Sequence, residues 1–296
     1  MHIFITGATG LIGQHLCPLL LDNNTVTVLS RNPAKASALL GNSVKAVKNI
    51  SSVDFNDVDI VINLAGEPIV NKRWSDKQKQ IIRDSRIVIT QKISAAIQVC
   101  STPPHTFISG SAVGFYGRQS SSLIDENFNN PHPEFSHQLC KDWEEAALLA
   151  QSALTRVCLL RTGIVLAKDG GALSKMLPAF KLCLGGPIGS GDQGMSWIHI
   201  DDMTQLILFI ISHPELSGPI NATAPNPVSN SEFSKSLGYA LSRPAFIPMP
   251  SIALKLLMGE MSDLLTTGQF VVPHKALAND YRFHYPDIKS ALESLV

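Results

Sequence analysis

The sequence lacks an excess of charge of either sign, since 24 basic residues balance 24 acidic ones in a chain of 296. The charge therefore gives no reason to expect binding to nucleic acid or to a membrane surface. Long hydrophobic runs are also missing, because stretches such as Leu206 to Ile211 fall far short of the roughly 20 residues that span a bilayer. No basic stretch typical of a signal peptide precedes the first apolar run, so we expect a cytoplasmic protein.

Cysteine is scarce. The five cysteines are scattered and form no C-x-x-C pair, which argues against a disulfide framework and against a zinc site. They are Cys17, Cys100, Cys140, Cys158 and Cys183. The pair Asp201-Asp202 precedes an apolar helical pattern, so we expect Asp201 to cap a helix and do not expect it to bind metal. The sequence predicts no metal site.

Apolar residues make up 45% of the chain and charged residues 16%, as in a globular protein with a substantial core. Short apolar runs alternate with helical patterns around 11–22, 76–100 and 138–152. The runs are Ile3–Ile5, Val26–Leu29, Ile60–Ile62, Thr106–Ile108 and Val157–Leu160. This alternation predicts an α/β protein with a Rossmann-type, doubly wound parallel sheet covered by helices on both faces.

The composition changes after about residue 164, and glycine and proline cluster at 185–191 and 224–227. We expect a smaller, mostly helical lobe over the carboxyl edge of the sheet, where ligands of open α/β sheets bind. The predicted Rossmann domain spans 1–163, with 196–212 returning to it. The predicted substrate lobe comprises 164–195 and 213–296.

A glycine-rich segment, Thr6–Gly13, follows the first predicted strand and opens the first predicted helix. Gly7 would permit a tight turn, Gly10 would let the backbone approach a pyrophosphate, and Gly13 would let the helix pack on the strand. The helix start would offer free N–H groups and a positive dipole end to an anion. The segment predicts dinucleotide binding; the alternative is a tight turn without a ligand.

The end of the second predicted strand distinguishes between cofactors. NAD sites usually carry an acidic residue there for the ribose 2′-hydroxyl, but this strand ends in Leu29-Ser30-Arg31-Asn32. The planar, permanently charged guanidinium of Arg31 suits a 2′-phosphate. The sequence therefore favours NADP (NADPH), unless Arg31 is an ordinary solvated side chain.

Together with the glycine segment, Asn63–Pro68 (NLAGEP) resembles the short-chain dehydrogenase/reductase (SDR) superfamily. Several further blocks resemble an atypical branch of the extended SDRs, the NAD-dependent epimerase/dehydratase-like family associated with sugar-nucleotide epimerases. These blocks are Asn63–Trp74, Ser109–Gly117, Leu139–Glu145, Leu160–Leu166, Gly185–Gly191, Trp197–Asp202 and Asn221–Pro227. The stretch 243–292 resembles the small C-terminal domain of that family.

The resemblance implies roles for individual residues. Gly7, Thr9, Gly10, Leu11, Ile12 and Gly13 would hold the pyrophosphate, and Arg31 would lie by the adenosine ribose phosphate. Leu64, Ala65, Gly66 and Glu67 would line the middle of the cofactor. Ser109 to Ser111 would lead toward the nicotinamide. Arg161, near the sixth strand, is expected to form hydrogen bonds within the second lobe.

SDR enzymes resemble one another in a Ser/Thr, Tyr and Lys set with the spacing Y-x-x-x-K, in which tyrosine exchanges a proton with the substrate. Ser111 fits the serine and Lys141 the lysine, where it would contact the nicotinamide ribose; the alternative is an exposed helix residue. His137 stands where tyrosine is expected. The proton could come from His137, from Tyr116, or from neither.

Two functions follow. The first is an NADP-dependent oxidoreductase or epimerase acting on a small hydroxyl- or carbonyl-bearing substrate, a nucleotide sugar included. The second is an NADPH-binding redox reader or scaffold without turnover. The helices predicted around 76–100 and 138–152 correspond to the pair that forms a dimer interface in many SDR enzymes, so the resemblance allows a homodimer as well as a monomer.

Overall fold

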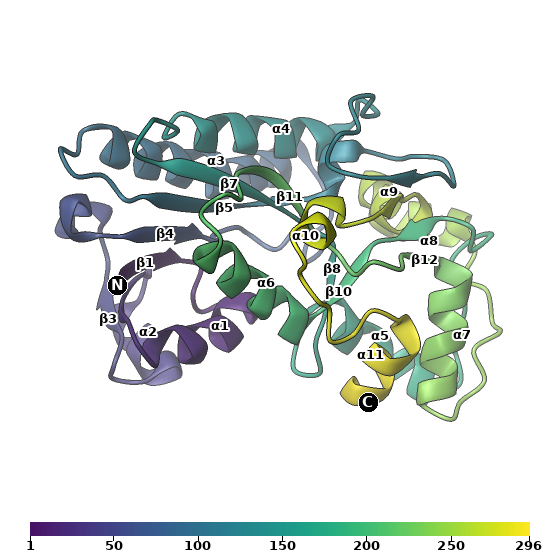
Figure 1. Cartoon of the computed structure of the whole chain (residues 1–296). Coiled ribbons are helices and arrows are strands. Elements are labelled where there is room, and N and C mark those ends of the chain that lie inside the picture. Colours follow the sequence, from purple (N-terminus) through teal and green to yellow (C-terminus); the bar gives the residue numbers. More distant parts are fainter.

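The computed structural model describes all 296 residues, and its largest element is a parallel sheet of seven strands (Figure 1). Their order is β11-β7-β5-β4-β1-β2-β3. The strands are β1 (His2–Thr6), β2 (Thr25–Leu29), β3 (Lys45–Val47), β4 (Ile60–Asn63), β5 (Thr106–Ala112), β7 (Arg156–Thr162) and β11 (Gly218–Ala222). The strand order reverses between β1 and β4, which confirms the predicted doubly wound Rossmann-type fold.

Helices cover both faces of this sheet (Figure 1). The first face carries α1 (Leu11–Leu21), α2 (Pro33–Leu40) and α6 (Ile200–Ser212). On the opposite face, α3 (Asp76–Gln98) and α4 (Phe135–Leu148) lie side by side. The three helical patterns in the first half of the sequence thus correspond to α1, α3 and α4.

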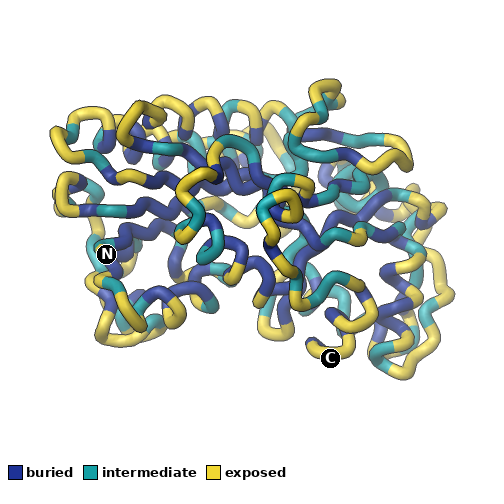
Figure 2. The backbone as a smooth tube through the Cα atoms, viewed as in Figure 1, coloured by how far each residue is buried: buried dark blue, intermediate teal, exposed yellow.

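Two hydrophobic cores lie between the sheet and its helices, one on each face of the sheet. Alternate residues of β1 enter different cores, because side chains of a strand point to opposite faces in turn. Ile3 and Ile5 pack with α1 and α6, whereas Phe4 packs with α3 and α4. All three side chains are fully buried, and Figure 2 shows the sheet as the most continuously buried part of the chain.

The strand register determines which residues meet at the carboxyl edge of the sheet. Thr6 at the end of β1 pairs with Leu29 of β2 on one side and with Asn63 of β4 on the other. Asn63 in turn pairs with Ser109 of β5. The segments that follow these strands, including the glycine segment and Arg31, therefore leave the sheet along one edge.

The second lobe has its own core, in which Trp197, Phe233 and Leu292 are fully buried. Its helices are α5 (Gly171–Lys181), α7 (Asn230–Ala240), α8 (Ser251–Met258), α9 (Asp263–Thr266), α10 (His274–Ala278) and α11 (Ile288–Leu295). The short strands outside the central sheet are β6 (Leu123–Ile124), β8 (Ile164–Leu166), β9 (Gly194–Met195), β10 (Trp197–His199), β12 (Val228–Ser229) and β13 (Phe270–Val271). The C-terminal region is mostly helical, as predicted.

Two features of the second half differ from expectation. β11 lies within the range 213–296 that we expected to belong to the second lobe, yet it is the edge strand of the central sheet and pairs with β7. Asp201 does not cap α6, since the cap is His199, whose Nδ1 accepts from the backbone N–H of Asp201 at 3.1 Å. None of the helices is both long and apolar enough to cross a membrane.

The packing of α1 on β1 yields a testable prediction. A Cβ on Gly13 would overlap the backbone of Ala8, whereas a Cβ on Gly10 would meet only the Gly7 carbonyl oxygen, at 3.2 Å. Gly13→Ala should lower the free energy of unfolding by about 1–3 kcal/mol, as overpacking does. Gly10→Ala is the matched control and should stay within about 0.5 kcal/mol of wild type. Urea unfolding measures both, and equal losses in the two variants would contradict this account.

Candidate functional site

The glycine segment forms a tight turn between β1 and α1. Gly7 has a φ of +72°, a conformation that glycine adopts without strain, and its carbonyl accepts from the Gly10 N–H at 2.9 Å. A Cβ on Gly7 would overlap the carbonyl of Leu64, so glycine also lets the segment after β4 come close. Glycine at 7 and 13 is therefore required by packing inside the protein.

Gly10 differs, because its Cα faces outward. Gly10 and Thr9 are exposed, and α1 begins at Leu11 with no side-chain cap and no acidic residue in its first turn. The amino end of α1 thus presents N–H groups and a positive dipole end to whatever approaches Gly10. A phosphate group fits this cradle, in which a larger residue at position 10 would project toward it.

The second lobe also contacts the start of α1, next to the glycine segment. A Cβ on Gly170, just before α5, would lie 3.0 Å from Cδ1 of Leu11, the first residue of α1. Asp169 approaches His15 of α1 at 3.2 Å. The loop that precedes α5 therefore lies against the start of α1 and borders the glycine segment.

Arg31 is exposed two residues beyond the end of β2. Its neighbour Asn32 caps α2 by accepting from the Lys35 N–H at 3.1 Å, so the two side chains have separate tasks. Because Thr6 pairs with Leu29, the chain leaves β2 beside the glycine segment, and Arg31 lies in the segment that follows. It supplies a positive charge at this edge.

The segment after β4 also follows this edge. Leu64, Ala65 and Glu67 are partly exposed and Gly66 is exposed. The Glu67 N–H donates to Ser85 Oγ of α3 at 2.9 Å. Ser109, in contrast, is fully buried in β5, so its hydroxyl lies beneath the surface of the site.

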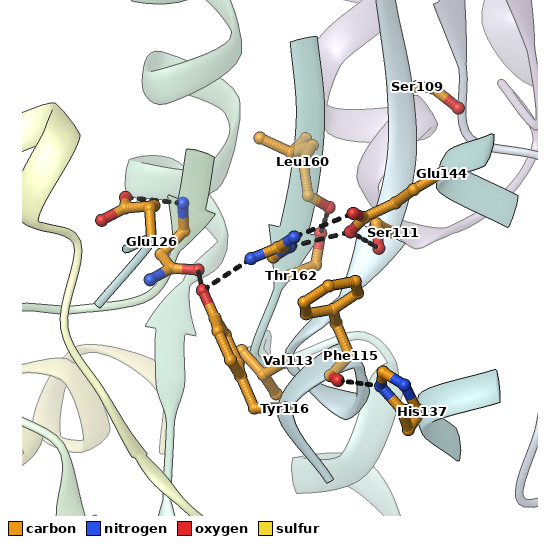
Figure 3. A network of polar contacts seen from close by, with 12 residues as sticks. Ser109, Ser111, Val113, Phe115, Tyr116, Glu126, His137, Glu144, Leu160 and Thr162 are labelled. Carbon is orange, nitrogen blue, oxygen red and sulfur yellow. Dashed lines mark hydrogen bonds and ion pairs between the residues drawn. The ribbon is translucent and has the colours of Figure 1, made fainter. Parts of the chain in front are cut away.

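A buried polar network links Ser111 to Tyr116 (Figure 3). Ser111 Oγ donates to Glu144 Oε1 at 2.7 Å, and Arg161 binds Glu144 through Nε at 2.8 Å and Nη2 at 2.9 Å. Arg161 Nη1 donates to Tyr116 Oη at 3.1 Å, and Tyr116 donates to Asn221 Oδ1 at 2.7 Å. The network joins β5, α4, β7 and β11 through five side chains.

Burial and neighbouring charges shift the pKa values of two side chains in this network. Burial raises the pKa of Tyr116 to about 12, although Arg161 acts in the opposite direction. Burial also penalises the Arg161 cation, but its bonds to Glu144 outweigh this penalty and raise the pKa of Arg161. Phe115 stacks on the guanidinium with its ring centre 3.5 Å from Cζ. Tyr116 is fully buried and Ser111 nearly so, so both hydroxyls are committed to the protein interior.

His137 lies at the start of α4 beside Phe115 (Figure 3). Its Nδ1 donates to the Phe115 carbonyl oxygen at 2.5 Å, and a carbonyl only accepts, so Nδ1 carries the hydrogen. In the neutral ring Nε2 is then the unprotonated nitrogen, and it forms no hydrogen bond within the protein. The side chain is partly exposed.

Lys141 lies on a different flank of α4 from the residues that face β5. The face toward the sheet carries Ser136, Cys140 and Glu144, whereas the side chain of Lys141 is 50% exposed and approaches only Glu145, at 3.9 Å. Each residue turns a helix by about 100°, so Lys141 cannot share the direction of Cys140. Ser111 therefore contacts Glu144 and not Lys141, whereas Lys141 lies one turn after His137 on the same flank of α4.

Sequence analysis did not identify Glu144 and Cys140 as residues of this site, and it gave Arg161 a different role. Arg161 was expected to form hydrogen bonds within the second lobe, but it pairs with Glu144 of α4 instead. Cys140 lies 3.5 Å from the place that a Cβ on Gly114 would take, and burial raises its pKa to about 12. The pattern of α4 offered a signal, since Ser136, Cys140 and Glu144 repeat every four residues. No group of three His, Cys, Asp or Glu side chains could hold a metal ion.

Known protein families cover most of the chain. The NAD dependent epimerase/dehydratase family matches residues 3–222, and a domain of unknown function, DUF1731, matches residues 249–295. The epimerase family protein ML0860 of Mycobacterium leprae is 42% identical over 98% of this chain and 94% of that protein. The epimerase family protein YfhF of Bacillus subtilis is 35% identical over 100% of this chain and 98% of that protein.

Solved structures agree with these matches. The human epimerase family protein SDR39U1, crystallised with NADPH, has a TM-score of 0.92 and 33% identity and covers 100% of this chain and 99% of that one. A nucleoside-diphosphate sugar epimerase from Corynebacterium glutamicum has a TM-score of 0.77 and 31% identity, covering 100% of this chain and 58% of that one. The likeness of sequence and fold over the whole length leads to one conclusion. The chain belongs to the NAD dependent epimerase/dehydratase family.

Proposed function

We propose that the protein is an NADPH-dependent oxidoreductase or epimerase acting on a small hydroxyl- or carbonyl-bearing substrate, with nucleotide sugars as one candidate class. The observation that carries the proposal is the uncapped amino end of α1, with Gly10 exposed in front of it and Arg31 beside it. A diphosphate fits the first feature and a ribose 2′-phosphate fits the second.

Most of the cofactor contacts would come from backbone. Thr9, Gly10, Leu11, Ile12 and Gly13 surround the start of α1, and Gly7 shapes the turn that exposes it. Leu64, Ala65, Gly66 and Glu67 would line the middle of the dinucleotide, with Ser109 buried beneath its nicotinamide end. When bound, NADPH supplies a hydride to a carbonyl carbon. The human relative crystallised with NADPH supports this choice of cofactor.

His137 is the group that we propose for proton exchange with the substrate. Its Nδ1 hydrogen bond fixes the ring, so Nε2 can accept the proton of a substrate hydroxyl when the substrate is oxidised, and the resulting imidazolium can return that proton to a carbonyl oxygen when the substrate is reduced. Imidazole is a common general acid and base in enzymes and suits this role. Ser111 and Tyr116 would act as positioning residues, because their hydroxyls are bound within the buried network.

A second candidate function is NADPH binding without turnover, as a redox reader or scaffold. The enclosure of the Ser111 and Tyr116 hydroxyls favours it. A protein that only binds the cofactor needs the glycine segment and Arg31 but no proton donor. The two candidates therefore differ in what they require of His137.

The cofactor preference can be tested through Arg31. Arg31→Ala should weaken NADPH binding about 10- to 100-fold, as loss of a charge-assisted bond does, and leave NADH binding unchanged. Calorimetry on both nucleotides measures the effect. Lys45→Ala, which removes an exposed cation at the far end of the neighbouring strand β3, is the control and should change neither affinity. Equal affinity of the wild-type protein for the two nucleotides would refute the preference.

The role of His137 can be tested through turnover. His137→Ala should lower kcat about 100- to 10,000-fold on any carbonyl or nucleotide-sugar substrate found by screening, with NADPH affinity retained. His132→Ala, an exposed histidine of the preceding loop, should remain active. A His137→Ala protein as active as wild type would exclude the proton role. Tight NADPH binding by wild type with no turnover across the screen would favour the second function.

A further inference from the structure

Large apolar side chains gather at the surface of the second lobe, on α8 and beside it. They are exposed by 59–76% and comprise Leu182, Leu184, Phe246, Ile252, Leu256 and Leu257, here called the α8 surface. Figure 1 shows α8 at the end of the molecule away from β3. Side chains of this size and exposure present an apolar area on the order of 600 Å², at the upper end of the largest patches on monomeric proteins. A patch of this extent indicates a binding surface.

The backbone brings the two parts of the α8 surface together. The Ile247 N–H donates to the Gly185 carbonyl oxygen at 3.3 Å, and the Met249 N–H donates to the Pro187 carbonyl oxygen at 2.9 Å. The segment that follows α5 therefore runs beside the segment that leads into α8. The six side chains thus belong to one continuous surface.

Packing inside the protein does not account for the apolar residues of this surface. Within α8, Leu254 is buried and Met258 is half-buried, so this side of the helix faces the lobe. Ile252 and Leu256 lie two residues on either side of Leu254 and point the opposite way, because two residues turn a helix by about 200°. Polar residues at these two positions would serve the fold equally well. Their apolar side chains are available to a partner.

The charge around the α8 surface is of one sign. Residues 170–191 and 233–259, which include it, contain no aspartate or glutamate. Their charged residues are all exposed and form no ion pair, and they are Lys175, Lys181, Lys235, Arg243 and Lys255. Glu293 of α11 shares a shallow groove with Arg243, whereas Lys181 and Lys255 adjoin the apolar side chains. The equal totals of acidic and basic residues in the whole chain conceal this distribution.

These charges distinguish between partners. In a symmetric dimer the α8 surface would meet its own copy, and basic residues would face basic residues. A membrane that contains anionic lipid offers the complementary charge, and its headgroup region accepts apolar side chains without a shaped pocket. The convex flank of a helix suits such a surface. A membrane of this kind therefore matches both the charge and the apolar character of the α8 surface.

We propose that the α8 surface binds the surface of a membrane that contains anionic lipid. Ile252, Leu256 and Leu257 enter the headgroup region, and Lys181 and Lys255 lie among the lipid phosphates. Attachment of this kind combines buried apolar area with electrostatic attraction, so each contribution can be removed separately. The inference is independent of the cofactor and of the reaction.

Co-sedimentation of the full chain with lipid vesicles tests the proposal. Vesicles of phosphatidylcholine mixed with phosphatidylglycerol should bind the protein at least about tenfold more tightly than vesicles of phosphatidylcholine alone. Raising the salt concentration from about 0.1 M to about 1 M should remove most of this difference, because the Debye length falls from about 10 Å to about 3 Å.

Paired variants separate the two contributions. Ile252→Gln combined with Leu256→Gln should weaken binding to the mixed vesicles about 10- to 100-fold through loss of apolar insertion. Lys181→Gln combined with Lys255→Gln should weaken it about 10- to 30-fold and remove most of the preference for anionic lipid. Val99→Gln, at an exposed apolar residue beyond α3, is the control and should bind as wild type does. Glutamine and leucine have similar helix propensities, so the variants should keep the Tm of wild type.

Three results would overturn the proposal. The first is wild-type protein that binds neither kind of vesicle or binds both equally. The second is a doubly substituted α8 variant that binds the mixed vesicles as tightly as wild type. The third is a wild-type dimer, measured by light scattering, that the same α8 variant dissociates, because the α8 surface would then belong to a second copy of the chain.

Discussion

The buried ion pair between Arg161 and Glu144 is the interaction on which the arrangement of this site depends. Both side chains are almost fully enclosed, and a buried pair is tolerable only when its geometry is good and its remaining donors and acceptors are used. Here the pair is bidentate, and Ser111 and Tyr116 take up further bonds. Because these residues come from α4, β5, β7 and the turn after β5, the pair fixes how α4 lies on the sheet. The position of every α4 residue relative to the site follows from it.

The local sequence was sufficient to predict five of the seven strands of the sheet and the glycine segment, but not β3 or β11. Continuous apolar runs such as Ile60–Ile62 mark strands that are buried on both faces, and the spacing of Gly7, Gly10 and Gly13 marks a strand-to-helix turn. Both signals depend on residues adjacent in the chain. The caps of α3 and α7 are equally local, since the hydroxyls of Ser75 and Ser229 accept from the N–H groups three residues later.

The sequence could not reveal which residues of α4 face β5. Matching a spacing places Lys141 in line with a known pattern, and its contact with the nicotinamide ribose stays a prediction. The direction of the other helix residues depends on packing, and the packing turns Cys140 and Glu144 inward. Glu144 and Glu145 are neighbouring residues of the same type, yet Glu144 is buried against Arg161 and Glu145 is exposed.

Binding and chemistry make different demands on this site. The proposed cofactor contacts use backbone N–H groups and the Arg31 guanidinium, which the start of α1 and the end of β2 hold in place. Proton exchange needs a group that titrates and has a free atom, and the buried network withholds the hydroxyls of Ser111 and Tyr116 from that task. The same ion pair that orders the site thus restricts its chemistry to the corner where α4 begins. In that corner the imidazole of His137 combines a fixed ring with an unbonded nitrogen, so whether this chain is an enzyme or only a binder depends on the small space around Nε2.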